Sequence, residues 1–444
     1  RMSSQKTVIM KSPEPPILLG ELPSALMNGP VWLKDKRIAA RDAFNAQGVP
    51  QRGLHLWRYT DPMEFLTETG TTSSEPSVKK PSQTASSVVP VGRFAAIARE
   101  KDGSQLSCEW NDVARKKGIV ISTLLEAVAS HSPIAEKHFS SLINASIGKL
   151  EARNTALWQN GIFVHIPKGQ TVELPIFLMR EVSAGQREVF PRLLIVVEEN
   201  AEVTIIDEYF GGSQSDSEGL TLANGAVEII AGANSRVKYV QLQQFEGAVH
   251  SYLTHRASID RGGSMVTIPL AFGGRVTKHN FGAILNGAGA ESNMYGLLFG
   301  GDRQHFDNHT LHHHNHGQTQ SNIDFKVVLR DKAVSAYTGL IRIENGARTC
   351  EAYQENRNLL LTPGTKAETI PELEILNEDV KCTHGATIGP IDPMSIFYLG
   401  SRGIPKDEAV RMIVGGLIET TIKIVPEDIR EQLSGVINSR LERL

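Results

Sequence analysis

The chain has 444 residues, 40% of them hydrophobic, and a formal net charge of -3. A chain of this length exceeds what one hydrophobic core usually organises, so we expect two or three structural units. The charge gives no electrostatic reason to expect nucleic acid or an anionic membrane as a partner. No apolar run is long enough to cross a bilayer, and the polar N-terminus, residues 1–11, lacks the apolar core of a secretory signal, which predicts a cytoplasmic protein.

The first predicted element is an amphipathic helix over residues 32–46, which Gly48 and Pro50 bring to an end. The residues expected on its apolar face are Ile38, Ala39, Ala43 and Phe44. Residues 118–132 and 139–147 also carry apolar side chains at helical spacing. Together these stretches predict a mixed, mainly helical N-terminal region.

Two features separate the first helix from the later ones. HLWRYTD, residues 55–61, contains Trp57 and Tyr59, which we interpret as anchors that fix the helical region onto the next domain. Residues 67–90 are rich in Ser, Thr and Pro and poor in large apolar groups. This composition predicts a loop or mobile linker.

From residue 154 onward, short runs of alternating apolar and polar residues replace the helical spacing. Each run is about four to eight residues long and is bounded by Gly, Asn, Asp or Pro, which predicts an all-β region. Similar glycine-containing turns begin at Ala231, Asp260, Asn286, Glu344 and Thr362. Their recurrence, on a scale of about 15 to 30 residues, is typical of a coiled β-solenoid. A β-sandwich would give similar strands, so the pattern alone leaves both folds open.

Helical spacing returns after Asp392, which with Pro393 makes a good helix start. The residues expected on the apolar faces of the two long helices are Ala409, Met412, Ile413 and Leu417, and Ile429, Leu433, Val436, Ile437 and Leu441. These faces are larger than a helix pair can bury within itself, so we expect docking on the β-region or on another chain. The predicted domains are 1–153, mainly helical; 154–391, the β core; and 392–444, helical.

Motifs of a conventional active site are missing from the sequence. It has no GxxxxGK[ST] phosphate-binding loop and no GxSxG. Cys108, Cys350 and Cys382 are far apart and form no CxxC pair, which argues against a disulfide framework or a self-contained zinc site. We interpret Cys350 as a core residue and expect no catalytic activity of the chain itself.

The strongest candidate for a functional side chain is His384, two residues after Cys382. In an extended segment such residues point to the same face, so imidazole and thiol could converge on one partner or ion. Gly385 leaves the neighbouring backbone uncrowded. The alternative is a hydrogen-bonded histidine at the end of the β core beside a buried, inert cysteine.

Six histidines gather in HFDNHTLHHHNHG, residues 305–317. The three expected to share a face on a strand are His312, His314 and His316. Asp307 or Asp324 could add an oxygen ligand for a borderline metal, which would suit a metal-dependent β-helix enzyme acting on a polysaccharide or small substrate. Histidines on a solenoid face also stack or hydrogen-bond across turns, so the purpose of the tract stays open.

Several motifs resemble those of one family. PELEI at residues 371–375, DVKCTHGAT at 379–387 and FYLGSRGI at 397–404 are similar to the C-terminal part of SufD-type proteins, scaffold subunits of the SUF iron–sulfur cluster assembly system in the SufB/SufD family. The Trp-Arg-Tyr-Thr run at 57–60 is similar to a signature near the start of these proteins. SufB-type chains carry a cysteine where this chain has Thr365, so the resemblance favours the SufD type.

The resemblance implies a right-handed parallel β-helix core between helical domains and a non-catalytic scaffold role. The implied partners are SufB, through the β-helix, and the ATPase SufC, through the C-terminal helices near residues 405–425. A nascent iron–sulfur cluster, or iron, would be held transiently at the SufB interface, with His384 as its ligand from this chain. A cluster needs about four ligands and this chain offers no such set, so the partner would supply the rest. A flavin in the complex is a further expectation, and a homodimer or a SufB-like role is the alternative within the family.

Overall fold

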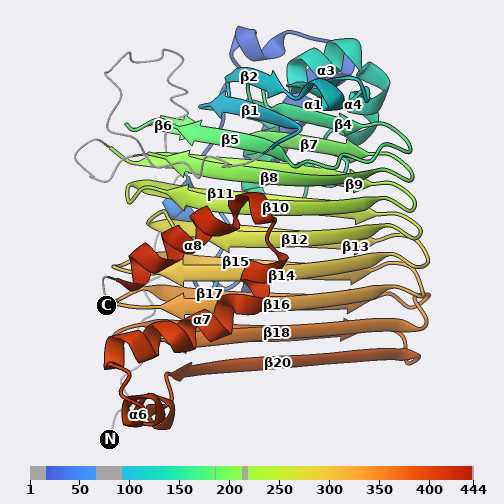
Figure 1. Ribbon diagram of the computed structural model, residues 1–444. Helices are drawn as coiled ribbons and strands as arrows, with labels where there is room; N and C mark the ends of the chain where they lie inside the picture. Colours follow the sequence, from blue (N-terminus) through green and yellow to red (C-terminus); the bar gives the residue numbers. More distant parts are fainter. Residues whose placement is uncertain (1–16, 67–92, 186, 213–218, 443–444) are drawn as a thin grey trace, which may run out of the picture.

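A parallel β-helix forms the body of the molecule in the computed structural model, which describes residues 17–66, 93–185, 187–212 and 219–442 (Figure 1). Two ten-stranded sheets enclose its interior. Sheet A has the order β2 (Gln105–Trp110), β1 (Ala96–Lys101), β5 (Ile176–Val182), β8 (Glu202–Gly211), β10 (Arg236–Phe245), β12 (Ser264–Ala271), β14 (Glu291–Gly300), β16 (Gln320–Leu329), β18 (Cys350–Leu360) and β20 (Val380–Pro390).

Sheet B faces sheet A across the interior. Its order is β19 (Lys366–Ile375), β17 (Val334–Ile343), β15 (His305–His314), β13 (Val276–Leu285), β11 (Val249–Ile259), β9 (Thr221–Ala231), β7 (Arg192–Val197), β4 (Ile162–Ile166) and β3 (Val120–Thr123), with β6 (Arg187–Val189) paired to β9. The chain alternates between the sheets, so each turn of the solenoid contributes one strand to each.

The regular turn length explains the recurrence seen in the sequence. The register partners Ser264, Glu291, Gln320 and Glu351 are 27, 29 and 31 residues apart along the chain, and the strands that carry them are parallel. Alternate residues point inward and form one long apolar core. The prediction of a mainly β fold with a β-helix core and flanking helices is therefore confirmed, and the β-sandwich alternative is wrong.

An N-terminal helical cap covers the outer face of sheet B at its β3 end. It contains η1 (Ser24–Met27), α1 (Val31–Ala46), η2 (His55–Trp57), η3 (Pro62–Phe65), α2 (Asp112–Arg115), α3 (Leu124–Ser130), α4 (Ser132–His138) and α5 (Lys149–Leu157). The buried face of α1 consists of Leu33, Arg37, Ala40 and Phe44, so only Phe44 of the predicted face is buried. The prediction missed this face because Arg37 is buried as a hydrogen-bond donor to the Ala156 and Trp158 carbonyls.

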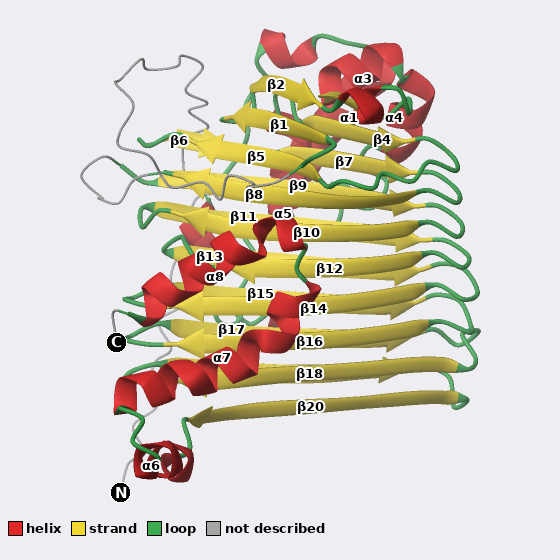
Figure 2. Ribbon diagram, viewed as in Figure 1, coloured by secondary structure: helices red, strands yellow, loops and turns green. Residues whose placement is uncertain are grey.

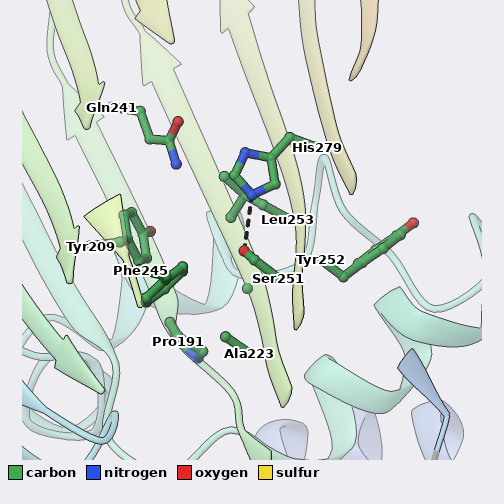
Figure 3. Close-up of a pocket in the computed structure, with 10 residues that line it drawn as sticks. Pro191, Tyr209, Ala223, Gln241, Phe245, Ser251, Tyr252, Leu253 and His279 are labelled. Carbon is green, nitrogen blue, oxygen red and sulfur yellow. Dashed lines mark hydrogen bonds between the residues drawn. The ribbon is translucent and has the colours of Figure 1, made fainter. Parts of the chain in front are cut away.

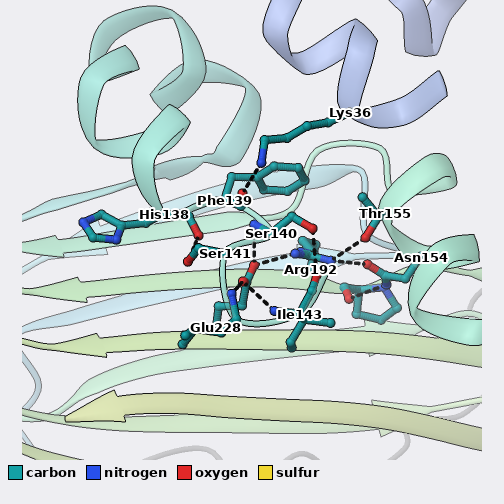
Figure 4. Close-up of polar contacts among 12 residues, drawn as sticks. Lys36, His138, Phe139, Ser140, Ser141, Ile143, Asn154, Thr155, Arg192 and Glu228 are labelled. Carbon is teal, nitrogen blue, oxygen red and sulfur yellow. Dashed lines mark hydrogen bonds and ion pairs between the residues drawn. The ribbon is translucent and has the colours of Figure 1, made fainter. Parts of the chain in front are cut away.

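Residues 139–147 form turns, and the predicted helix there is wrong. The backbone amides of Ser140, Leu142 and Ile143 donate to the buried Glu228 carboxylate on β9 at 2.9, 2.8 and 3.0 Å, and Ser140 has φ +57° (Figure 4). Amides wrapped around one carboxylate cannot make helical hydrogen bonds at the same time, so the tertiary contact overrides the apolar spacing.

The three C-terminal helices are α6 (Pro393–Ser401), α7 (Lys406–Ile424) and α8 (Glu427–Leu441). Of these, α7 and α8 lie across the outer face of sheet A, and α6 lies beyond the edge of β20 (Figure 2). The buried face of α7 consists of Ala409, Val414, Ile418 and Thr421. Of the predicted residues only Ala409 is fully buried, and Met412 is exposed. The buried residues of α8 are Ile429, Leu433, Ile437 and Leu441, as predicted except for the half-buried Val436.

Two predictions concern segments outside the described residues: the N-terminus at 1–11 and the Ser/Thr-rich stretch at 67–90. Within the parts of the chain that the structure describes, no helix is both long and apolar enough to cross a membrane.

Candidate functional site

The β-helix is open at its C-terminal end. β19 and β20 are the edge strands of their sheets there, and among the described residues no further strand covers them. Both last-turn strands carry half-buried and exposed residues where the preceding turns are buried. Ile375 and Ile388, for example, are 40% and 44% exposed, although they lie at register positions that are inward-facing in earlier turns.

Cys382 and His384 both lie on β20, on the inward side of this open end. β20 pairs with β18 in parallel, with Cys382 opposite Ala352 and His384 opposite Gln354. Ala352 and Gln354 are buried inward-facing residues of β18, so the two residues opposite them face the same way. The structure thus brings the predicted thiol and imidazole to one face, next to the end of the core.

The two side chains differ in exposure. Cys382 is half-buried beside the cluster around Cys350, and burial raises the pKa of its thiol to about 11, so it is a neutral thiol at physiological pH. His384 is exposed, and within the described part of the chain its ring has no hydrogen-bond or ion-pair partner. A free imidazole beside a protonated thiol can offer one nitrogen to a ligand or partner without first breaking a contact.

Cys350 is fully buried, as interpreted from the sequence. Its sulfur lies 3.2 Å from the Thr319 hydroxyl and 3.4 Å from the Ala347 carbonyl oxygen. It belongs to the apolar cluster that closes the last complete turn. Its surroundings are those of a core residue.

The histidine tract does not form the shared face that the sequence suggested. β15 ends at His314, so His316 lies in the following exposed turn, while His312 and His314 point into the solenoid. His314 contacts the hydroxyls of Thr319 and Ser321 at 2.7 and 2.8 Å, and His312 contacts that of Ser292 at 3.1 Å. Burial lowers the pKa values of His312 and His314 to about 3 and about 4, so both rings are neutral hydrogen-bonding groups of the core.

A metal site in the tract has no geometric support. Among residues 17–66, 93–185, 187–212 and 219–442, no group of three or more His, Cys, Asp or Glu side chains is arranged to hold a metal ion. The outward His313 instead forms a hydrogen bond with Glu344 across turns at 2.8 Å, as the alternative interpretation of the tract expected.

The outward residues of the same strand form a buried polar cluster that the sequence analysis missed. His305, Asp307 and His309 alternate along β15, and the Thr60 hydroxyl lies 2.9 Å from His305 Nε2 and 2.6 Å from Asp307 Oδ2. Lys278 donates to Asp307 Oδ2 at 2.8 Å. The period-two spacing of these residues was the available signal, since it places all three on one face.

Trp57 covers this cluster. Its ring stacks on Tyr252 with centroids 5.8 Å apart, and the Lys278 ammonium lies 5.0 Å from the Trp57 ring centroid. The Trp-Arg-Tyr-Thr run therefore fixes the N-terminal segment onto the β-helix through Trp57 and Thr60. The anchoring interpretation fits Trp57, which is buried, whereas Tyr59 is only half-buried.

A small cavity lies inside the β-helix between sheets A and B (Figure 3). Its volume is about 10 Å³, enough for about one water molecule. His279 Nε2 is 2.9 Å from the Ser251 hydroxyl there, and Gln241 Oε1 and His279 Nδ1 lack partners among the described atoms. The cavity lies within the core, and none of the predicted site residues lines it.

A second exposed feature lies at the same end of the molecule as β20. α6 follows β20 directly, contacts α7, and buries none of its residues. The large exposed apolar residues on these two helices are Met394, Phe397, Tyr398 and Met412, and Phe397 is 70% exposed. Apolar side chains grouped in this way mark an interaction surface more often than an ordinary solvated face.

Comparison with known proteins covers almost the whole chain. The profile described as SUF system FeS cluster assembly, SufBD core domain, matches residues 179–417, more than half of the chain, and the SufBD protein N-terminal region profile matches residues 27–178. The iron-sulfur cluster assembly protein SufD of Bacillus subtilis is 25% identical over 422 residues, which are 93% of this chain and 95% of that protein. A SufBD family protein of Staphylococcus epidermidis and one of Staphylococcus aureus are each 24% identical over 427 residues, covering 94% of this chain and 91% of each relative.

Proposed function

The chain belongs to the SufBD family of iron–sulfur cluster assembly proteins, as a SufD-like member, and we propose that it is a scaffold subunit that builds a nascent cluster at an interface with SufB. In this proposal the open end of the β-helix binds SufB, the C-terminal helices bind the ATPase SufC, and His384 is the ligand that this chain contributes. The cluster, or iron, is a transient cargo. ATP hydrolysis belongs to SufC.

The observation that carries the proposal is the unprotected edge of β20. Monomeric proteins usually guard an edge strand with charged residues or proline. β20 carries such residues only at its ends, Lys381 and Pro390, and none between them, whereas the neighbouring edge strand β19 carries Pro371 and several glutamates along its length. Such an edge suits pairing with a strand of another chain, which would also cover Ile375 and Ile388.

His384 lies where a partner strand would meet this edge. An imidazole nitrogen is a suitable ligand for iron in mixed clusters, and a protein that offers one histidine needs thiolates from elsewhere. Cys382 is protonated at neutral pH, so we assign the thiolates to SufB. Cluster transfer is favoured by this sharing because separation of the subunits removes part of the ligand set.

The exposed face of α6 and α7 is the proposed SufC contact. The residues that α7 directs at sheet A are already buried, so Met412 and the α6 side chains are the apolar surface left for a partner. The position of α6 directly after β20 would let movement of bound SufC subunits act on the open end. ATP-driven closure of SufC would then change how SufB and this chain meet, and a flavin in the complex stays a prediction.

Co-purification with SufB and SufC from the same source tests the proposal. We would compare wild type, His384→Ala, Phe397→Asp and the control Thr383→Ala, which lies on the opposite face of β20. Iron, sulfide and anaerobic absorbance spectra would be measured for each complex. We expect His384→Ala to form the complex but lose most of its cluster, Phe397→Asp to lose SufC while keeping SufB, and Thr383→Ala to match wild type.

Two outcomes would contradict it. Full cluster content in the His384→Ala complex would remove His384 as a ligand. A wild-type chain that binds neither partner but forms a dimer of its own would support the homodimer alternative instead.

A further inference from the structure

We propose that Gln354 positions His384 for ligand binding, by accepting a hydrogen bond from one nitrogen of its ring when the open end is covered. This inference rests on the proposed function. Gln354 would act through His384 and would not itself touch the cluster.

Gln354 is the residue directly beneath His384 in the β-helix. The two are register partners on the adjacent parallel strands β18 and β20, so their backbones are about 4.8 Å apart. Side chains at paired positions on the same face of parallel strands stack along the solenoid. Of the neighbours of His384, Thr383 points the other way and Gly385 has no side chain.

The amide of Gln354 is oriented by the core. Its side chain is 0% exposed and crosses to sheet B, where Nε2 donates to the Gly339 carbonyl at 3.2 Å. A Cβ atom at Gly339 would overlap this Nε2 and lie 2.6 Å from the Tyr337 hydroxyl. The absence of a side chain at position 339 therefore makes the room in which the amide sits.

This orientation leaves one acceptor unused. Gln354 Oε1 is buried and has no hydrogen-bond partner among the described residues. A buried amide oxygen without a partner is unfavourable, so it favours any conformation that brings a donor. On β20, Ala386 cannot donate and Cys382 is a weak donor, which leaves the His384 ring as the suitable group.

The chemistry of a histidine ligand explains why this pair matters. A metal-bound imidazole uses one nitrogen for the metal and donates the N–H of the other to an acceptor, which fixes the ring orientation. Covering of the open end by a partner strand would exclude water from His384 and leave Gln354 Oε1 as its acceptor. Loss of such an acceptor typically weakens metal binding about 10–100-fold.

The test compares complexes with SufB and SufC that carry Gln354→Met, Gln354→Glu or Gly339→Ala. Met has nearly the shape of Gln but no acceptor oxygen; Glu keeps an oxygen in place and, when protonated, can donate to Gly339. Ala at 339 leaves Gln354 intact but displaces its amide. The matched control is Asn358→Leu, because Asn358 is also a buried amide of β18 and, unlike Gln354, already bonds to β20, by donating to the Thr387 carbonyl.

The measurements are the dissociation constant for iron, the cluster content, and pulsed EPR of the reduced cluster, which detects a coordinated histidine nitrogen. We expect Gln354→Met and Gly339→Ala to weaken iron binding at least about 10-fold and to alter the nitrogen coupling. Gln354→Glu should keep the iron affinity and the nitrogen coupling of the wild type. Asn358→Leu should change only the thermal midpoint. A purely structural role of Gln354 would lower the midpoint without changing the coupling.

The outcomes separate this inference from the proposed function. If His384→Ala loses cluster and Gln354→Met keeps wild-type cluster and coupling, the positioning role is wrong and the ligand role stands. If His384→Ala also keeps its cluster, both are wrong.

Discussion

Lys278 and Asp307 form a buried ion pair on the outer face of sheet B, with both side chains only 1% exposed. Burial alone would raise the pKa of Asp307, but Lys278 and His309 keep it well below its usual range. The carboxylate therefore stays charged and accepts from both Lys278 and Thr60. Removing one member of such a buried ion pair is costly, because the remaining partner is left buried and unpaired.

Asp307→Asn should lower the free energy of unfolding by about 3–5 kcal/mol, because it leaves the Lys278 ammonium without a counter-charge. Chemical denaturation of the full chain would measure the loss. Glu344→Gln is the control, since Glu344 pairs with His313 and Arg342 near the surface, and there about 0–1 kcal/mol is expected. Equal small losses in the two variants would contradict a stabilising role of the buried pair.

At the residue scale, the sequence predicted which side chains share a strand face better than it predicted which residues surround them. The sequence placed Cys382 and His384 on one face because strand alternation is local. It missed the pairing of Thr60 with Asp307, residues that are 247 positions apart, since no local pattern encodes which distant segment covers a strand. It also overlooked Gln354, whose proposed role depends on its register with a residue 30 positions later, on β20.

Glu228 shows how a single side chain on a strand organises an element of the cap. Its carboxylate accepts from three backbone amides of residues 140–143 and from Arg192, whose guanidinium is also fully buried. Arg192 in turn donates to Asn154 of α5. The helical cap is thus fixed to sheet B by a polar network as well as by apolar packing.

Glu228→Gln should loosen this part of the cap. The amide keeps one acceptor oxygen but presents an NH2 group to the donors, and Arg192 loses its counter-charge, so we expect a loss of about 3–5 kcal/mol. Hydrogen exchange of the amides of residues 140, 142 and 143 would show the loss as faster exchange. Glu419→Gln, which breaks only an exposed pair with Lys423 on α7, is the control; unchanged exchange in the Glu228 variant would contradict the role of the carboxylate.

Elements with strict periodicity were predictable, and those shaped by tertiary contacts were not. The glycine turns and strands of the β region follow the expected recurrence, because each turn repeats the same inward and outward alternation. The stretch 139–147 and the buried face of α1 differ from the prediction because a polar group is buried there. The buried face of α7 differs because the sheet beneath it selects other residues. The position of the open end required the strand order of the whole molecule.

The whole β-helix carries several neutral histidines in its interior. Burial lowers the pKa values of His255, His279 and His312 to about 3 and that of His314 to about 4. In the unfolded chain these rings bind a proton below about pH 6.5. The unfolded state then holds more protons, so stability is full above about pH 6.5 and is lost as the pH falls toward the folded pKa values.

His255→Phe tests this proton linkage. Neither ring nitrogen of His255 has a hydrogen-bond partner on another described residue, and the ring lies between Tyr239 and Phe281. Phe fits such a site, so stability at neutral pH should be unchanged or higher by about 1 kcal/mol. The slope of unfolding free energy against pH between about 4 and 6 should fall by up to about 1.4 kcal/mol per pH unit.

Phe281→Leu is the control for this measurement, because it disturbs the same aromatic contact without removing a titratable group. Its stability should fall at every pH while the slope stays that of the wild type. An unchanged slope in His255→Phe would show that His255 does not contribute to the acid sensitivity.

The open end gives the molecule one surface on which its core is incomplete. Ile388→Asp places a charge at this end, where a partner would have to bury it, so we expect the affinity for SufB, and for any second copy of this chain, to fall at least about 10-fold. Ile147→Asp is a matched control, because both isoleucines are 44% exposed and Ile147 lies in the N-terminal cap. Light scattering would report self-association, and titration with SufB the heterodimer. Equal losses for the two variants would mean that charge alone weakens binding, whereas a loss confined to Ile388→Asp would assign the interface to the end of the β-helix that presents His384.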